Sequence, residues 1–214
     1  MHATSKRKST PAFIMAFKLH GYNISTCTRR VAQIAKERNI PYELVPIDLP
    51  SLENKQEVHI AHHPFGQMPY ITVRPPSISC MTCAVSYHLA KQQDDGFELY
   101  ESRAIGRYLA TLGSGPELIP TDPKARANFE QAASIEYAQF DPIAGGILHE
   151  RVFKQFHGLP ADEERVKELV PQLESKLDVY EVILSKQKYL AGDVRSFHSK
   201  CVQKTLSVLT EYFV

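Results

Sequence analysis

The fold is decided by residues 16–47, AFKLHGYNISTCTRRVAQIAKERNIPYELVPI. Residues 16–20 are typical of a short strand that ends at a turn. Within 26–39 the apolar residues recur at helical spacing, and charged residues, Arg30 among them, occupy the opposite side. Residues 42–47 then alternate as a second strand. This stretch therefore predicts a strand, a helix and a second strand parallel to the first.

The remaining pattern extends this unit and then changes. A short polar helix, two strands and an amphipathic helix are predicted at 52–62, 68–71, 97–100 and 101–112. Beyond a linker at 113–121 only helices are predicted, one at 122–140 and one from 162 onward that Pro171 bends or restarts. The fold class is therefore α/β followed by all-α, in two domains.

Composition excludes several classes of function. The 214 residues contain 25 Lys plus Arg and 24 Asp plus Glu, a formal charge of +1, and beyond Lys6-Arg7-Lys8 no block of like charge indicates a nucleic-acid surface. No stretch approaches the roughly 18 apolar residues of a membrane span, and the first residues lack a secretory signal. Four cysteines are too few for a disulfide framework. We therefore expect a cytoplasmic protein without nucleic-acid or membrane partners.

Three motifs carry a resemblance to a known family. They are HGYNISTCTRRV at 20–31, HPFGQMP at 63–69 and LYESRAI at 99–105. In this order they resemble the phi-class glutathione transferases of plants and fungi. The resemblance implies a thioredoxin-like glutathione domain, with a βαβ and then a ββα unit in a mixed sheet. It also implies a helical domain that holds much of an apolar substrate pocket, and a homodimer.

Ser25 is the expected catalytic residue. A glutathione transferase must hold the glutathione thiol as a thiolate, although a free cysteine thiol has a pKa of about 8.5. Ser25 lies where the first strand meets the helix, so its hydroxyl can donate to the sulfur while the helix dipole favours the anion. The alternative is that Ser25 or Thr26 only caps the helix. A second alternative is a reactive thiol at Cys27, two residues beyond the matching position.

The resemblance also implies a set of glutathione-binding residues. They are Asn54, Lys55, Gln67, Met68, Pro69, Glu101 and Ser102. The Met68-Pro69 bond is expected to be cis and to direct backbone groups at the cysteinyl part of glutathione. Lys55 is expected to pair with the glycine carboxylate. At the start of the next helix, Ser102 can receive the γ-glutamyl carboxylate and Glu101 its ammonium group.

Two other groups of side chains have competing interpretations. His59, His62 and His63 lack cysteine or carboxylate partners at ligand spacing, so we expect a histidine-bearing surface and no metal. In the second half, aromatic residues either line an apolar substrate pocket or belong to the core: Phe129, Tyr137, Phe140 and Phe153. No cofactor is expected, because glutathione is a co-substrate.

Three segments depart from the family pattern. Residues 1–14 are expected to be a disordered extension, 72–93 an insertion in the glutathione domain (15–112), and 194–214 an aberrant tail after a truncated helical domain (122–193). The insertion holds a Cys80-x-x-Cys83 pair without a second pair that would make a zinc site. We interpret the insertion and the tail as translated introns.

The sequence therefore predicts conjugation of the glutathione thiolate to electrophilic apolar compounds, or reduction of organic hydroperoxides by the same thiolate. A ligand-binding protein without turnover and a structural domain of this fold are alternatives. A further alternative is an inactive product of a mis-spliced gene, whose truncated helical domain leaves apolar surface uncovered.

Overall fold

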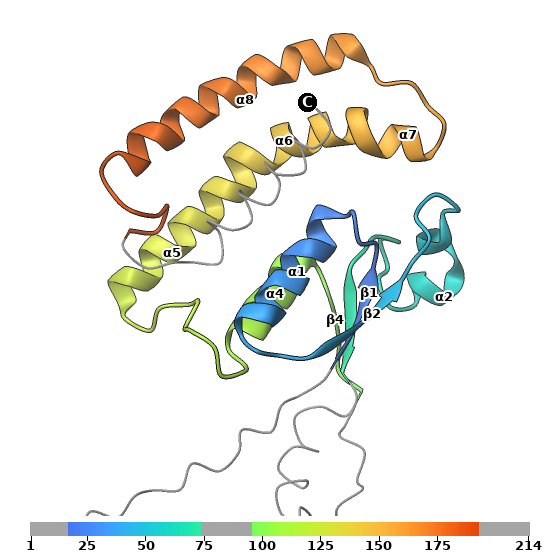
Figure 1. The fold of residues 1–214 in the computed structure, drawn as a ribbon, viewed down its shortest axis with the longest axis horizontal. Helices are drawn as coiled ribbons and strands as arrows, with labels where there is room; N and C mark the ends of the chain where they lie inside the picture. Colours follow the sequence, from blue (N-terminus) through green and yellow to red (C-terminus); the bar gives the residue numbers. More distant parts are fainter. Residues whose placement is uncertain (1–16, 74–95, 193–214) are drawn as a thin grey trace, which may run out of the picture.

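The structure, a computed structural model, describes residues 17–73 and 96–192 (Figure 1). Its first part is a four-stranded sheet in the order β2-β1-β3-β4. The strands are β1 (Phe17–Gly21), β2 (Tyr42–Pro46), β3 (Tyr70–Val73) and β4 (Glu98–Tyr100). β1 pairs with β2 in parallel, and β3 is antiparallel to both β1 and β4. The predicted strand, helix and parallel strand are confirmed, and the mixed sheet is thioredoxin-like.

Two helices, α1 (Thr26–Glu37) and α4 (Ser102–Ala110), lie side by side on one face of this sheet (Figure 1). Because successive strand residues point to opposite faces, Phe17 and Leu19 of β1 face the helices. The core includes Leu19, Val31, Ile34, Ile71, Ile105 and Leu109. Phe129, from the second half of the chain, is fully buried in the same core. Burial of each such side chain stabilises the fold by about 1.5–3 kcal/mol.

The opposite face of the sheet carries histidine and tyrosine rings. The β1–β3 register aligns His20 with Tyr70, and their rings stack with centroids 4.4 Å apart. The predicted helix at 52–62 is instead two short pieces, η1 (Glu53–Lys55) and α2 (Glu57–Ile60). The residue between them, Gln56, has extended backbone angles, which interrupt the helix.

The expectation of a histidine surface is wrong for two of the three side chains. His59 and His63 are only 9% and 2% exposed. The Nδ1 atom of His59 lies 3.0 Å from the hydroxyl of Tyr70, and the ring of His63 lies 4.7 Å from that of Tyr100. Both histidines are buried because strand aromatics offer them ring contacts and a hydrogen bond.

The second half is a long helical rod with one further helix along it (Figure 1). The rod consists of α5 (Pro123–Ile135), η3 (Glu136–Phe140), α6 (Asp141–Leu148), η4 (His149–Phe153) and α7 (Lys154–Phe156), and the further helix is α8 (Glu163–Leu184). The rod does not end at the predicted Phe140, because η3 is a π-helical turn that carries the chain past Pro142. Pro171 is exposed and lies within α8 without ending it.

The segment between the two halves is held by the end of α1. Arg38 donates from Nε to the carbonyl oxygen of Leu112 at 2.6 Å and from Nη2 to that of Gly113 at 3.2 Å. Its Nη1 donates to the carbonyl oxygens of Gly115 and Pro116. Gly113 has a φ of +72°, and a Cβ atom there would lie 2.0 Å from the Arg38 carbonyl oxygen, so only glycine fits.

Several expected segments lie outside the described residues: the extension, most of the insertion with its Cys80-x-x-Cys83 pair, and the tail. Thr72 and Val73, which we expect in the insertion, continue β3 and pair with β1. Within 17–73 and 96–192, none of the helices combines the length and hydropathy that a bilayer-spanning helix requires.

Candidate functional site

Ser25 lies at the junction of β1 and α1, at the N-terminal end of the helix. Its Oγ accepts a weak hydrogen bond from the Thr28 N–H at 3.4 Å, so it is the N-cap. The side chain is 7% exposed, and no acidic residue occupies the first turn of α1. Because Oγ acts as an acceptor, its hydrogen can be donated to a second group, and the helix end favours an anion there. The capping role and the proposed catalytic role are therefore compatible.

Cys27 is partly exposed in the first turn of α1, and its Sγ lies 3.7 Å from Nη1 of Arg30. Within the described part of the chain it is the free cysteine. Its thiol contacts a guanidinium group that is itself committed to other partners, as described below.

The Met68-Pro69 peptide bond is cis, as predicted. Pro69 is buried and directly precedes β3, Met68 is half-buried, and Gln67 is exposed. The loop before this bond is held from η1. Asn54 is buried and donates from Nδ2 to the Gly66 carbonyl oxygen at 2.7 Å.

Lys55 is exposed beside the same loop, where its Nζ donates to the Phe65 carbonyl oxygen at 3.3 Å. Burial lowers the pKa of His63, the charge of Glu101 raises it and that of Lys55 lowers it. In contrast to the exposed Lys55, Asn54 is buried, and its hydrogen bond to the Gly66 carbonyl oxygen holds the loop.

Glu101 and Ser102 lie where β4 meets α4. Glu101 has a φ of +69°, a region that non-glycine residues rarely adopt, and it is exposed. Ser102 is the first residue of α4 and is only 5% exposed. Its Oγ accepts a hydrogen bond of 2.7 Å from Nη1 of Arg30. Ser102 therefore lies at a helix N-terminus and is hydrogen-bonded to the buried guanidinium group of Arg30.

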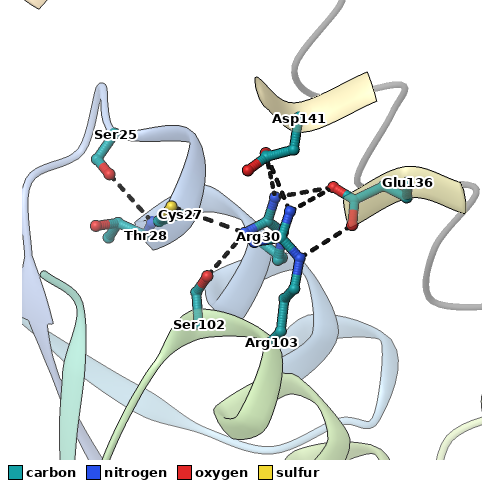
Figure 2. Close-up of polar contacts among 8 residues, drawn as sticks. All are labelled: Ser25, Cys27, Thr28, Arg30, Ser102, Arg103, Glu136 and Asp141. Atoms are coloured by element: carbon teal, nitrogen blue, oxygen red, sulfur yellow. Dashed lines mark hydrogen bonds and ion pairs between the residues drawn. The ribbon is translucent and has the colours of Figure 1, made fainter. Parts of the chain in front are cut away.

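Arg30 belongs to a charged cluster that joins the two halves of the chain (Figure 2). Its side chain is 2% exposed, and Nη2 lies 3.4 Å from Oε1 of Glu136, which is fully buried. Arg103 donates to both oxygens of Glu136, at 3.0 and 2.8 Å, and also contacts Asp141 at 3.0 Å. The expectation that Arg30 lies on the exposed side of its helix is therefore wrong, because buried carboxylate and hydroxyl oxygens pair with it.

The aromatic residues of the helical half divide between core and surface. Phe129 and Phe140 are fully buried in the two hydrophobic cores, which favours the core interpretation for both. Tyr137 is 63% exposed beneath the guanidinium of Arg103, and Phe153 is partly buried. A different aromatic contact crosses between the halves: the Tyr22 ring meets the Phe156 ring edge-on at 5.8 Å.

In the part of the chain that the structure describes, no three His, Cys, Asp or Glu side chains gather as a metal site would require. The histidine-bearing face has a different property. Burial lowers the pKa of His20 from 6.5 to about 4, with contributions in the same direction from His62, Lys18 and His59, and Glu98 acts in the opposite direction.

This shift predicts a loss of stability in mild acid. The unfolded chain binds a proton at His20 below a pH of about 6.5, whereas the folded chain resists it until about 4. Stability is therefore lost as the pH falls through that window. A His20→Phe variant keeps the ring contact with Tyr70. We expect its Tm to fall less between pH 7 and pH 5 than the Tm of the unmodified protein.

A Thr72→Val variant is the matched control, because it removes the hydrogen-bond partner of His20 Nε2 at 3.1 Å but leaves the titrating ring. It is expected to lower Tm at both pH values by similar amounts. If Tm depends on pH equally in His20→Phe and in the unmodified protein, the loss of stability in mild acid does not come from His20.

Known proteins resemble this chain in sequence. A family model described as "Glutathione S-transferase, N-terminal domain" matches residues 24–112. A glutathione S-transferase of Arabidopsis thaliana, PM239X14, is 44% identical over 184 residues, which cover 84% of this chain and 75% of the relative. A glutathione S-transferase of Hypomyces subiculosus, hmp2, is 36% identical over 183 residues, with 84% and 76% covered.

Solved structures resemble it in fold. Poplar glutathione transferase F1 superposes with a TM-score of 0.74 at 30% identity, covering 91% of this chain and 81% of the poplar chain. Maize glutathione S-transferase I, solved with an atrazine glutathione conjugate, has a TM-score of 0.73 at 29% identity, covering 91% and 82%. Sequence and fold therefore point to the same group of proteins.

Proposed function

Because this chain belongs to the glutathione S-transferase family, we propose that Ser25 donates its hydroxyl to the sulfur of bound glutathione and that the resulting thiolate attacks an apolar electrophile. The chain is a glutathione transferase, as its relatives are named. The position of Ser25 carries the proposal: it caps α1, where the helix N-terminus favours an anion. A hydroxyl donor and a helix end together lower the pKa of a thiol from its ordinary value of about 8.5.

The rest of glutathione extends over the residues around the cis bond and the start of α4. We propose that Ser102 and Glu101 bind the γ-glutamyl end, since Ser102 begins a helix and Glu101 is exposed beside it. Lys55 would then pair with the glycine carboxylate, and Gln67 and the Met68 backbone would contact the middle of the peptide. The hydrogen bonds of Asn54 and Lys55 to the carbonyl oxygens of Gly66 and Phe65 hold both residues against the loop that leads to the cis bond, which supports a single site there.

The electrophile is proposed to bind between the halves, above Ser25. The loop that carries Ser25 also carries Tyr22, whose ring meets Phe156 of the helical half. Aromatic side chains there offer an apolar wall close to the sulfur position. The maize relative was solved with the glutathione conjugate of atrazine, which supports an apolar electrophile for this chain as well.

The test uses the full chain, glutathione and a chlorinated dinitrobenzene. A carbon–sulfur bond forms, chloride leaves, and the thiol proton passes to solvent, so conjugate absorbance and chloride release must rise together. Glutathione at about 100 times its Kd is expected to add about 2.7 kcal/mol of stability and to raise Tm. A rise in Tm without turnover would favour the ligand-binding alternative. The absence of both turnover and a rise in Tm would favour an inactive product.

We also propose a homodimer in the cytoplasm, the compartment in which glutathione keeps thiols such as Cys27 reduced. Large apolar side chains are exposed along η1, α2 and the loop that follows: Leu52, Val58, Ile60 and Phe65. Phe65 is the most exposed of them at 68%. Several exposed large apolar side chains within one short segment are typical of a region that contacts another subunit.

A Phe65→Ser variant is expected to weaken the dimer by more than about tenfold, because buried aromatic side chains contribute most of the binding energy at interfaces. Light scattering after gel filtration over a range of protein concentrations measures the shift. Val58→Ser, 60% exposed on α2, is the matched control with the smaller expected effect. A protein that is monomeric before either change would refute the dimer.

A further inference from the structure

The Arg30 side chain is buried at the point where the two halves of the chain meet (Figure 2). One of its nitrogens, Nη1, donates to Ser102 Oγ at 2.7 Å and lies 3.7 Å from Cys27 Sγ. The other, Nη2, contacts the carboxylates of Glu136 at 3.4 Å and Asp141 at 3.8 Å. This one side chain therefore connects the start of α4 to the helical half.

The charge of the cluster is balanced without a ligand. Arg30 and Arg103 face two carboxylates, Glu136 and Asp141. Arg103 alone makes two hydrogen bonds to Glu136, with Nε and Nη2 as donors. Arg103 and Glu136 therefore form an ion pair between the halves that does not depend on Arg30. The hydrogen bond from Arg30 to Ser102 is not needed for this ion pair.

The hydrogen-bond chemistry of the two groups gives that contact a direction. A guanidinium group has only donors, whereas a hydroxyl group has one donor and two acceptor lone pairs. Ser102 Oγ must therefore act as the acceptor toward Arg30, and its hydrogen is left to point elsewhere. A hydroxyl oriented in this way, next to a buried positive charge and at a helix N-terminus, is a ready donor to a carboxylate.

We propose that Arg30 is a positioning residue for glutathione, which holds the Ser102 hydroxyl as a donor to the γ-glutamyl carboxylate. This inference rests on the proposed function and assigns it one more residue. Arg30 acts through Ser102 and does not itself touch the peptide. Its removal leaves the Ser102 hydroxyl free to rotate, so glutathione affinity falls while the electrophile site is unaffected.

The test is a double-mutant cycle on the full chain with glutathione as the probe. Arg30→Met, which has no donor, is expected to raise the glutathione Kd and KM at least tenfold and to leave the KM of the electrophile within twofold. Arg30→Lys, which keeps one donor and the buried charge, is expected to restore the Kd to within about threefold of the unmodified protein. In a Ser102→Ala background neither change should weaken glutathione binding further.

Two controls separate this role from a purely structural one. Arg38→Lys alters another buried arginine close to the end of α1 and is expected to lower Tm without changing the glutathione KM. Cysteinylglycine, which lacks the γ-glutamyl group, should have the same KM with the unmodified protein and with Arg30→Met.

Two results would overturn the inference: an unchanged glutathione Kd in Arg30→Met, or an equal loss in the Ser102→Ala background. Should Arg30→Met not fold, Arg30→Lys carries the same cycle: its glutathione Kd is expected to be about two- to threefold above that of the unmodified protein, and this increase must disappear in the Ser102→Ala background. Failure of the unmodified protein to bind glutathione would instead refute the proposed function, so the two failures are distinguishable.

Discussion

Replacement of Ser25 by alanine is expected to lower kcat/KM for glutathione conjugation by about 10²- to 10³-fold, the effect of removing one hydrogen-bond donor from a developing or bound anion. Without the hydroxyl, the sulfur keeps only the N-terminus of α1 as a stabilising partner. The thiol pKa should then return toward its ordinary value of about 8.5. The remaining activity is therefore expected to rise steadily between pH 6.5 and 8.5, as stopped assays at each pH would show.

The capping role of Ser25 needs its own control. Asp122 caps α5 by accepting from the N–H groups of Lys124 and Ala125, at 3.1 and 2.9 Å. Loss of either cap is expected to cost about 1 kcal/mol of stability. Asp122→Ala should therefore lower Tm about as much as Ser25→Ala and leave kcat/KM unchanged. Equal activity in the two variants would show that Ser25 is a cap and nothing more.

Replacement of Arg38 by alanine is expected to cause the largest loss of stability, about 3 kcal/mol, or roughly 6–12 °C in Tm. Its guanidinium group donates to the carbonyl oxygens of four residues between Leu112 and Pro116. Arg38 is only 7% exposed, so water can replace these bonds only after the segment moves away from α1. Thermal unfolding followed by circular dichroism measures the change.

Arg165→Ala is the matched control for this loss. The Arg165 side chain is 53% exposed and pairs with Glu168 one turn along α8, at 2.9 Å. An exposed pair of this kind contributes about 0.2–1 kcal/mol. Arg38→Ala should therefore shift Tm several times further than Arg165→Ala, and similar shifts in both would mean that the segment after α4 is held by other contacts.

The features that could be predicted from the sequence are those determined by residues close together along the chain. The strand, helix and strand at 16–47 follow a period that local residues determine. The position of Ser25 at the start of α1 and the place of Pro69 just before a strand follow from local rules in the same way. The cis bond at Pro69 depended on the family resemblance, because the dipeptide alone does not indicate it.

What could not be predicted depends on partners far away in sequence. Arg30 is indistinguishable from Arg29 in the helical pattern, and its burial follows from Ser102 and Glu136, which lie 72 and 106 residues further on. Glu136 did leave a signal, because it falls at helical spacing on the apolar stripe of Phe129 and Phe140. A single carboxylate on such a stripe requires a buried cation, and this reasoning could have found the cluster.

Phe129 has a consequence for how the chain folds. It follows the linker in sequence, yet its fully buried ring belongs to the core between the sheet and α1. Glu136, two turns further along the rod, likewise neutralises the buried charge of Arg30. A fragment that stops at the linker would have a cavity in place of the Phe129 ring and would lack both carboxylates, Glu136 and Asp141, that pair with the buried Arg30. The boundary at 113–121 is therefore a boundary in the sequence pattern, and the two halves form one cooperative unit.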